Sequence, residues 1–199
     1  MNEQLNNLKN EVLGTALKMF EEKLCAGTSG NVSAFYPKEK LVVITPSSYD
    51  YAIMEAEDIV VIDLEGNRIE GRHKPSSEWK MHAELYKGLE RVKAVVHTHS
   101  PYATSFAALR KEVPVILIEM APALNGSLEV SPYAAQGTAE VGTYALPILE
   151  KKNACLLANH GVVAVGEDLR SAYLSAAYAE DAARICHLAM CIGQPVVLE

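Results

Sequence analysis

Three histidines stand where metal ligands are expected. His97 and His99 alternate with Thr98 at the end of an apolar run, and on a β-strand such side chains point to the same face. His160 ends a second apolar run and is followed by Gly161, where a buried strand is expected to turn. Three neutral imidazole nitrogens with a fourth position left open suit a catalytic zinc ion. On spacing alone, a surface pair of hydrogen-bonding histidines at an edge strand remains the alternative.

A second polar group precedes a predicted helix. The amphipathic segment 78–90 begins with Glu78 and is preceded by Ser76 and Ser77. At such a helix start, hydroxyls and free backbone N–H groups can bind a phosphate. Ser76 or Ser77 is expected to cap this helix. Glu78 is a candidate acid/base, although a glutamate at a helix start commonly only complements the helix dipole. His82, one helical turn later, is interpreted as a structural or exposed residue rather than a ligand.

Two further loops offer groups that can bind an anion. Residues 27–31, with the sequence GTSGN, contain Gly30 and Asn31 in a stretch of small residues with free N–H groups. Ser47 and Ser48 follow a predicted strand and could line the same site. Each loop is explained equally well as a plain turn.

The remaining segments must position these residues. Helical spacing predicts helices at 3–24, 78–90, after Pro101, 138–151 and 169–192. Runs rich in β-branched residues predict strands at 32–37, 41–46, 59–64, 68–71, 92–99, 114–120, 153–161 and 161–166. The short turns between successive strands favour antiparallel pairing. We therefore expect one α/β domain spanning residues 1–199 with a largely antiparallel sheet.

Composition narrows the class of protein. The chain has 199 residues, of which 49 % are hydrophobic and 22 % charged, as in ordinary globular proteins. A net charge of -7 disfavours general nucleic-acid binding. No apolar run approaches the roughly 20 residues of a membrane span, and the N-terminus lacks the pattern of a signal peptide. Four cysteines without metal-site spacing suggest reduced thiols. We expect a cytoplasmic protein without membrane or nucleic-acid partners.

The order of the motifs resembles the class II aldolase/adducin family. The matching stretches run from about Gly27 to Val165 and are GTSGNVS, ITPSS, KPSSEWKMH, VVHTHSPYA, SPYAAQGT and LLANHGVVAVG. The resemblance implies a three-layer α/β/α sandwich around a mainly antiparallel, mixed sheet, and usually a homotetramer. It also implies one Zn²⁺ per subunit, with the ligands Glu78, His97, His99 and His160. The phosphate positions that it implies are Gly30, Asn31, Ser47, Ser48, Ser76 and Ser77.

The implied reaction is retro-aldol cleavage of a small ketose 1-phosphate, such as L-fuculose 1-phosphate. Dihydroxyacetone phosphate and a short aldehyde would form through an enediolate held on the metal, with Glu78 moving the proton. A sugar-phosphate epimerase, which usually has aspartate in place of Glu78, and a methylthioribulose-1-phosphate dehydratase are the enzymatic alternatives. A non-catalytic module like the adducin head is disfavoured by the intact ligand set. Ile118 and Glu119 stand where family aldolases have an aromatic hydroxyl, and Gln136 replaces a pocket phenylalanine, so the aldehyde is left open.

Overall fold

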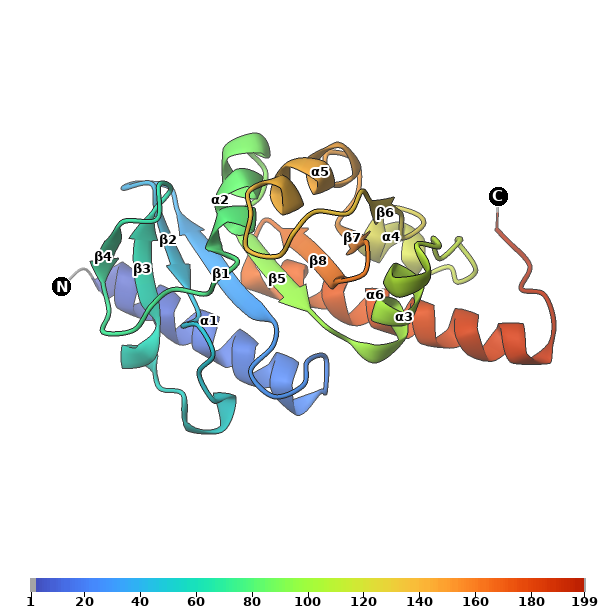
Figure 1. Cartoon of the computed structure of the whole chain (residues 1–199), viewed down its shortest axis with the longest axis horizontal. Coiled ribbons are helices and arrows are strands. Elements are labelled where there is room, and N and C mark those ends of the chain that lie inside the picture. The colour runs from blue at the N-terminus through green and yellow to red at the C-terminus, as the bar shows by residue number, and fades with distance from the viewer. Residues whose placement is uncertain (1–2, 199) are drawn as a thin grey trace.

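One mixed sheet organises the chain in the computed structural model, which describes residues 3–198 (Figure 1). Its eight strands follow the order β4-β3-β2-β1-β5-β8-β7-β6, and all neighbours are antiparallel except β6 and β7. The strands are β1 (Asn31–Tyr36), β2 (Leu41–Ile44), β3 (Val60–Asp63), β4 (Arg68–Glu70), β5 (Ala94–Thr98), β6 (Val130–Ser131), β7 (Ala154–Leu157) and β8 (Gly161–Gly166).

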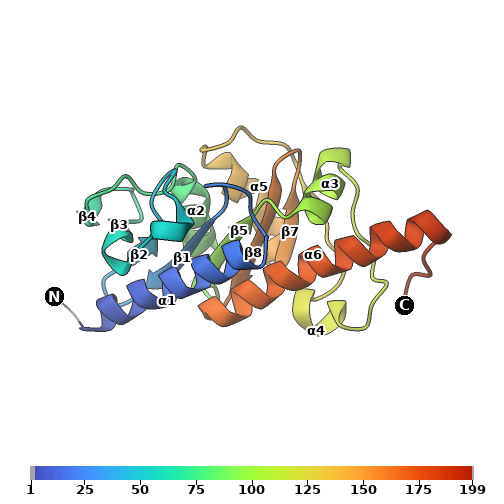
Figure 2. The ribbon, with the colours of Figure 1, turned by 90° about the horizontal axis from the view of Figure 1, so that it is seen from below.

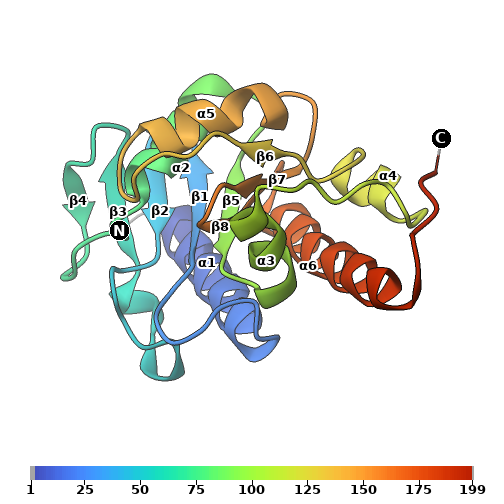
Figure 3. The same cartoon turned by 45° about the vertical axis from the view of Figure 1, so that its right-hand side comes forward.

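Helices cover both faces of this sheet. They are α1 (Glu3–Glu21), α2 (Trp79–Gly88), α3 (Pro101–Leu109), α4 (Met120–Leu124), α5 (Glu140–Leu149) and α6 (Leu169–Ile192). Figure 2 shows α1 and α6 lying across one face, and Figure 3 shows α2 and α5 on the opposite one. This arrangement confirms the predicted three-layer α/β/α fold. No helix within residues 3–198 has the length and apolar character needed to cross a membrane.

Alternation along β5 decides which layer receives the functional side chains. Val96 packs into the core beneath α1 and α6, whereas Val95 packs into the core beneath α2 and α5. Because strand side chains alternate, His97 projects to the same side as Val95, toward α2. The strand thus carries His97 to the edge of the α2 and α5 layer, where Glu78 immediately precedes α2.

Two predicted features are wrong. The run 114–120 is not a strand: Val113 makes an isolated bridge with Leu128, the chain continues irregularly, and Met120 already begins α4. Its apolar residues cover the rim of the larger core, and Ile118 is 76 % exposed, so no sheet partner lines up with them. The sheet edge is instead the two-residue β6, which the sequence did not indicate.

The start of α2 also differs from the prediction. Glu78, rather than Ser76 or Ser77, occupies the N-cap position, and it makes no side-chain capping hydrogen bond. Ser76 Oγ accepts a hydrogen bond from the Glu78 N–H at 3.3 Å. The carboxylate of Glu78 is therefore free to turn away from the helix, toward the histidines.

Candidate metal centre and adjoining pocket

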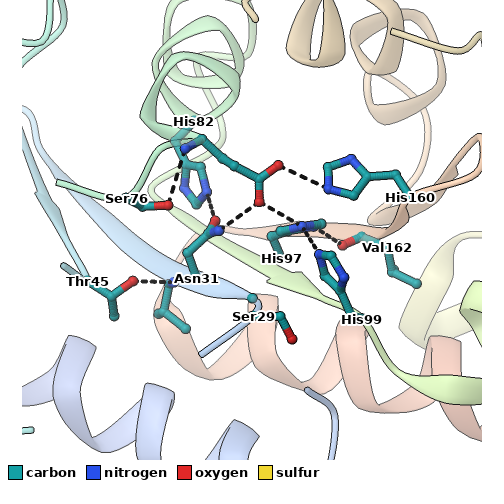
Figure 4. A network of polar contacts seen from close by, with 12 residues as sticks. Ser29, Asn31, Thr45, Ser76, His82, His97, His99, His160 and Val162 are labelled. Atoms are coloured by element: carbon teal, nitrogen blue, oxygen red, sulfur yellow. Dashed lines mark hydrogen bonds and ion pairs between the residues drawn. The ribbon is translucent and has the colours of Figure 1, made fainter. Parts of the chain in front are cut away.

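Candidate ligand side chains converge where β5 ends and β8 begins, and Figure 4 shows the three histidines among them, His97, His99 and His160. Ligand atoms of Glu78, His97, His99 and His160 all lie within 4.8 Å of one another. His97 Nε2 is 2.9 Å from His99 Nε2 and 3.0 Å from Glu78 Oε2, and His160 Nε2 is 3.0 Å from Glu78 Oε1. The structure thus brings together all four residues that the sequence singled out as ligands, and their binding of a metal stays a prediction.

A close approach between two strands places His160 beside His97. His97 lies within β5, His99 follows the strand end, and His160 lies in the turn between β7 and β8. A Cβ atom at Gly161 would lie only 2.4 Å from Thr98 O and 3.3 Å from His97 Cε1. Glycine at this position therefore lets the turn lie directly against the end of β5.

The tautomer of His97 suits a metal ligand. Its Nδ1–H donates to the backbone carbonyl of Val162 at 2.7 Å, so the lone pair of Nε2 faces the centre of the cluster. A buried backbone acceptor of this kind orients the ring as outer partners of metal-bound histidines do.

Two atoms of the cluster lack the hydrogen bonds that burial demands. Glu78 Oε1 and His160 Nε2 are buried, and although they are 3.0 Å apart, neither has a hydrogen-bond partner within residues 3–198. Such unpaired atoms cost about 1–3 kcal/mol each. A tetrahedral ion with bonds of about 2.0–2.1 Å holds its ligand atoms about 3.4 Å apart, close to the distances observed. The four residues therefore fit a single divalent metal.

Electrostatics favour a cation in this position. Burial opposes the charge on Glu78, but His97 and His160 outweigh it and hold the pKa of the carboxyl well below its usual range. Burial likewise opposes a charge on His97, yet Glu78 raises the pKa of that imidazole. Burial and the neighbouring His97 lower the pKa of His99 to about 4. The carboxylate of Glu78 is thus kept ionised, whereas the imidazole of His99 is kept neutral.

A polar pocket of about 210 Å³ adjoins the cluster. Its lining includes all six predicted phosphate positions, Gly30, Asn31, Ser47, Ser48, Ser76 and Ser77, together with Glu78, His99 and Gln136. None of the residues that line it is lysine or arginine. An anion in this pocket would therefore be held by hydroxyl, amide and backbone N–H donors.

Cross-loop hydrogen bonds hold the two serine pairs side by side. The N–H of Ser47 donates to Lys74 O at 2.9 Å, and the N–H of Ser76 donates to Thr45 O at 3.0 Å. An isolated antiparallel bridge joins the same two loops at residues 46 and 75. Ser48 has a φ of 53°, which turns the first loop back toward the pocket. The pocket is thus built by two loops that are distant in sequence.

The residues that depart from the family pattern divide into two groups. Gln136 lines the pocket beside His99. Ile118 is exposed, and Glu119 is the N-cap residue of α4, where it lines a separate pocket with Tyr178. Within one chain, therefore, only Gln136 lies where it can touch a molecule bound at the metal centre.

His82, which the sequence analysis interpreted as structural or exposed rather than a ligand, is a buried neighbour of the site. His82 is fully buried and hydrogen-bonds through Nε2 to Asn31 Oδ1, and Asn31 Nδ2 donates to Glu78 Oε2 at 3.0 Å. The spacing of four residues between Glu78 and His82 puts both on one side of α2. That spacing was the only signal in the sequence, and it could not show which strand faces the helix.

Comparisons with known proteins agree with this site. The family model of the class II aldolase and adducin N-terminal domain matches residues 10–187. The 5-deoxy-D-ribulose 1-phosphate aldolase of Bacillus thuringiensis serovar kurstaki is 37 % identical, over 98 % of this chain and 91 % of that protein. The 5-methylthioribulose-1-phosphate/5-deoxyribulose-1-phosphate aldolase of Rhodospirillum rubrum is 36 % identical, over 96 % and 85 %. A solved L-fuculose 1-phosphate aldolase superposes with a TM-score of 0.92 at 38 % identity, over 97 % and 91 %.

Proposed function

The chain belongs to the class II aldolase/adducin family and is a lyase of the class II aldolase type, and on that premise we propose that it cleaves a ketose 1-phosphate. The products would be dihydroxyacetone phosphate and a short aldehyde. The observation that carries the proposal is the convergence of Glu78 and three histidines beside a pocket of neutral phosphate donors. A non-catalytic binding module does not require a candidate metal site next to a phosphate pocket.

We propose that His97, His99 and His160 hold one Zn²⁺ per subunit, and that Glu78 is its fourth ligand while substrate is absent. The neutral nitrogens and single carboxylate suit zinc, although Mn²⁺ and Co²⁺ accept the same ligands. When bound there, the metal would supply a Lewis acid for the substrate carbonyl and the adjacent hydroxyl.

The side chains around the metal would bind the phosphate and transfer the proton. Ser47, Ser48, Ser76 and Ser77 would bind the phosphate and so fix the distance from the phosphate to the reacting carbons. Glu78 would take up and return the proton of the substrate carbon, a role typically worth roughly 10²–10⁴-fold in rate.

The preferred substrate that we propose is a 5-deoxypentulose 1-phosphate, with L-fuculose 1-phosphate second. The first choice follows the names of the two sequence relatives, and the second follows that of the solved structure. Gln136 supports the same order, because it lines the pocket where family aldolases for fuculose phosphate have phenylalanine.

Product analysis by mass tests the proposed reaction. The purified protein is incubated with 5-deoxyribulose 1-phosphate, L-fuculose 1-phosphate and ribulose 5-phosphate, each with and without a chelator. Release of dihydroxyacetone phosphate that the chelator abolishes is the expected result. A new, chromatographically separate product of unchanged mass would indicate an epimerase, and a product that has lost one water molecule would indicate a dehydratase.

We also propose a cytoplasmic homotetramer. Cys25, Cys155, Cys186 and Cys191 are all free thiols, as in a reducing compartment. Apolar side chains on the outer side of α6, including Leu188 and Met190, are about half exposed (49 % and 55 %), which suits a subunit interface. Light scattering on the purified protein should give four times the 21.6 kDa of one chain.

A further inference from the structure

Behind Glu78 lies a line of buried polar side chains, which we name the buried relay. It comprises Tyr86, Ser33, His82 and Asn31, and it ends on Glu78. Tyr86 Oη is 2.6 Å from Ser33 Oγ, and Ser33 Oγ is 2.6 Å from His82 Nδ1. His82 Nε2 is 2.5 Å from Asn31 Oδ1, and Asn31 Nδ2 is 3.0 Å from Glu78 Oε2. Each side chain of the relay is less than a tenth exposed.

The direction of each hydrogen bond follows from the Glu78 end. An ionised carboxylate only accepts, so the group of Asn31 that faces it must be the NH₂ group. The carbonyl oxygen of Asn31 then faces His82, and because it can only accept, the proton of His82 must be on Nε2. Complete burial lowers the pKa of His82 to about 3, so the ring is neutral and its Nδ1 is an acceptor.

The opposite end of the relay accommodates the same direction. With Nδ1 of His82 accepting, the hydroxyl of Ser33 must donate to it and is left with lone pairs for Tyr86. Burial raises the pKa of Tyr86, so the phenol keeps its proton and donates it to Ser33. Every donor in the relay therefore points toward Glu78.

A reversed relay would be harmful at the site. If His82 carried its proton on Nδ1, its Nε2 would accept from Asn31, and the amide would have to turn over. The carbonyl oxygen of Asn31 would then face Glu78 Oε2, and two acceptors 3.0 Å apart would repel each other. Glu78 would lose its only amide donor within residues 3–198 and move from its place between His97 and His160.

From this geometry we propose that His82 is a positioning residue: its Nε2–H orients the amide of Asn31, which in turn fixes the carboxylate of Glu78 for proton transfer. Ser33 and Tyr86 hold His82 in the required tautomer. The kinetic part of this inference rests on the proposed function, because it requires Glu78 to move the substrate proton. The tautomer of His82 is independent of any reaction.

Nitrogen NMR of the ring tests the tautomer directly. ¹⁵N-labelled protein is recorded metal-free and zinc-loaded at neutral pH, and the signal of His82 is identified by its absence in His82→Gln. The expected result is a neutral ring with the proton on Nε2 in both samples. A proton on Nδ1, or a charged ring, would overturn the proposal.

Steady-state kinetics tests the positioning role. His82→Leu, assayed at saturating zinc, should lower kcat roughly 10–100-fold, the range usual for residues that orient ligands from behind, with a smaller change in KM. His82→Gln, whose amide NH₂ can replace Nε2–H as donor to Asn31, should recover most of kcat. Equal losses in the Leu and Gln variants would contradict a positioning role for the Nε2–H donor.

A matched pair of hydroxyl deletions separates positioning from general destabilisation. Ser33→Ala removes the donor to His82 Nδ1 and should lower kcat several-fold. Ser175→Ala removes a similarly buried hydroxyl on α6 that donates only to backbone carbonyls, and it should leave kcat unchanged. Equal kcat values in the two variants would refute the proposal. If the wild-type protein cleaves no ketose phosphate, the proposed function fails, while the tautomer measurement still decides the inference.

Discussion

Substitution of Gly161 by alanine should separate His160 from the rest of the metal centre. The new Cβ would lie 2.4 Å from Thr98 O, whereas ordinary contacts begin at 3.4 Å, so the turn and β5 must move apart by about 1 Å. His160 is the neighbouring residue in that turn and would move with it. Metal–ligand bonds tolerate only about 0.2 Å, so a shift of this size should weaken the site.

Gly161→Ala should change both the free energy of unfolding and the zinc affinity. The strained contact should lower the free energy of unfolding by about 1–3 kcal/mol, the usual range for overpacking. Zinc affinity should fall at least 10–100-fold, roughly the effect of losing a residue that orients a ligand. Competition with a chromophoric chelator measures the affinity, and urea unfolding of the metal-free protein measures the stability.

Gly14→Ala supplies the matched control, because it is the same chemical change at a site with no neighbour. Gly14 lies on the exposed side of α1, and a Cβ there meets nothing within 4 Å. Alanine should stabilise the helix by up to about 1 kcal/mol and leave zinc affinity unchanged. An unchanged zinc affinity in Gly161→Ala would refute the reasoning that the close approach of β8 and β5 builds the site.

Three further outcomes are expected. Glu78→Gln should lower kcat roughly 10²–10⁴-fold in cleavage assays; a loss below tenfold at full zinc occupancy would exclude it as the proton carrier. Gln136→Phe should raise kcat/KM for L-fuculose 1-phosphate relative to 5-deoxyribulose 1-phosphate at least tenfold, measured by competition between the two; an unchanged ratio would show that this residue does not contact the aldehyde end. Burial would raise the pKa of Asp58, but Arg72 and the Glu55 N–H hold it well below the usual range, so its stabilising effect is present above about pH 3.9 and is lost as pH falls. Asp58→Asn should therefore cost about 2 kcal/mol in urea unfolding at pH 7. The cost should decrease progressively as pH is lowered below about 3.9, and a cost that stays constant to the lowest pH at which the protein folds would contradict the assignment.

The candidate ligands could be found in the sequence because their signals are local. An apolar run that ends in two alternating histidines predicts a strand, and it predicts that the side chains of His97 and His99 point to the same face. His160 and Gly161 likewise mark a turn between two apolar runs. What the sequence does not contain is the pairing of β5 with β8, which brings the ligand atoms of the two local patterns to within 4.8 Å of one another.

The pocket and the buried relay needed the structure, because long-range contacts create both. Ser48 and Ser76 lie together only because the loops around residues 46 and 75 form an isolated bridge. His82 contacts Ser33 only because β1 passes beneath α2, and a separation of 49 positions in the sequence leaves no periodic pattern. A histidine at helical spacing looks the same in a sequence whether it faces solvent or a buried serine.

The failure of the strand prediction for residues 114–120 also has a physical explanation. Residues 114–120 have the β-branched composition of a strand, but β-propensity reports fit to a half-buried surface rather than a backbone preference. The segment packs partly buried against the rim of a core that the sheet already covers, and Val115 is bonded to the C-terminal segment by a hydrogen bond from Leu198 to its carbonyl.

Metal titration of the stripped protein tests the central claim most directly. Zinc is added back in steps to protein freed of metal, and the release of dihydroxyacetone phosphate from a ketose 1-phosphate is followed at each step. The account predicts no release without metal and a rise that saturates at one zinc per chain, with His160→Ala shifting the curve to much higher zinc. Cleavage that persists in the metal-free protein would contradict it.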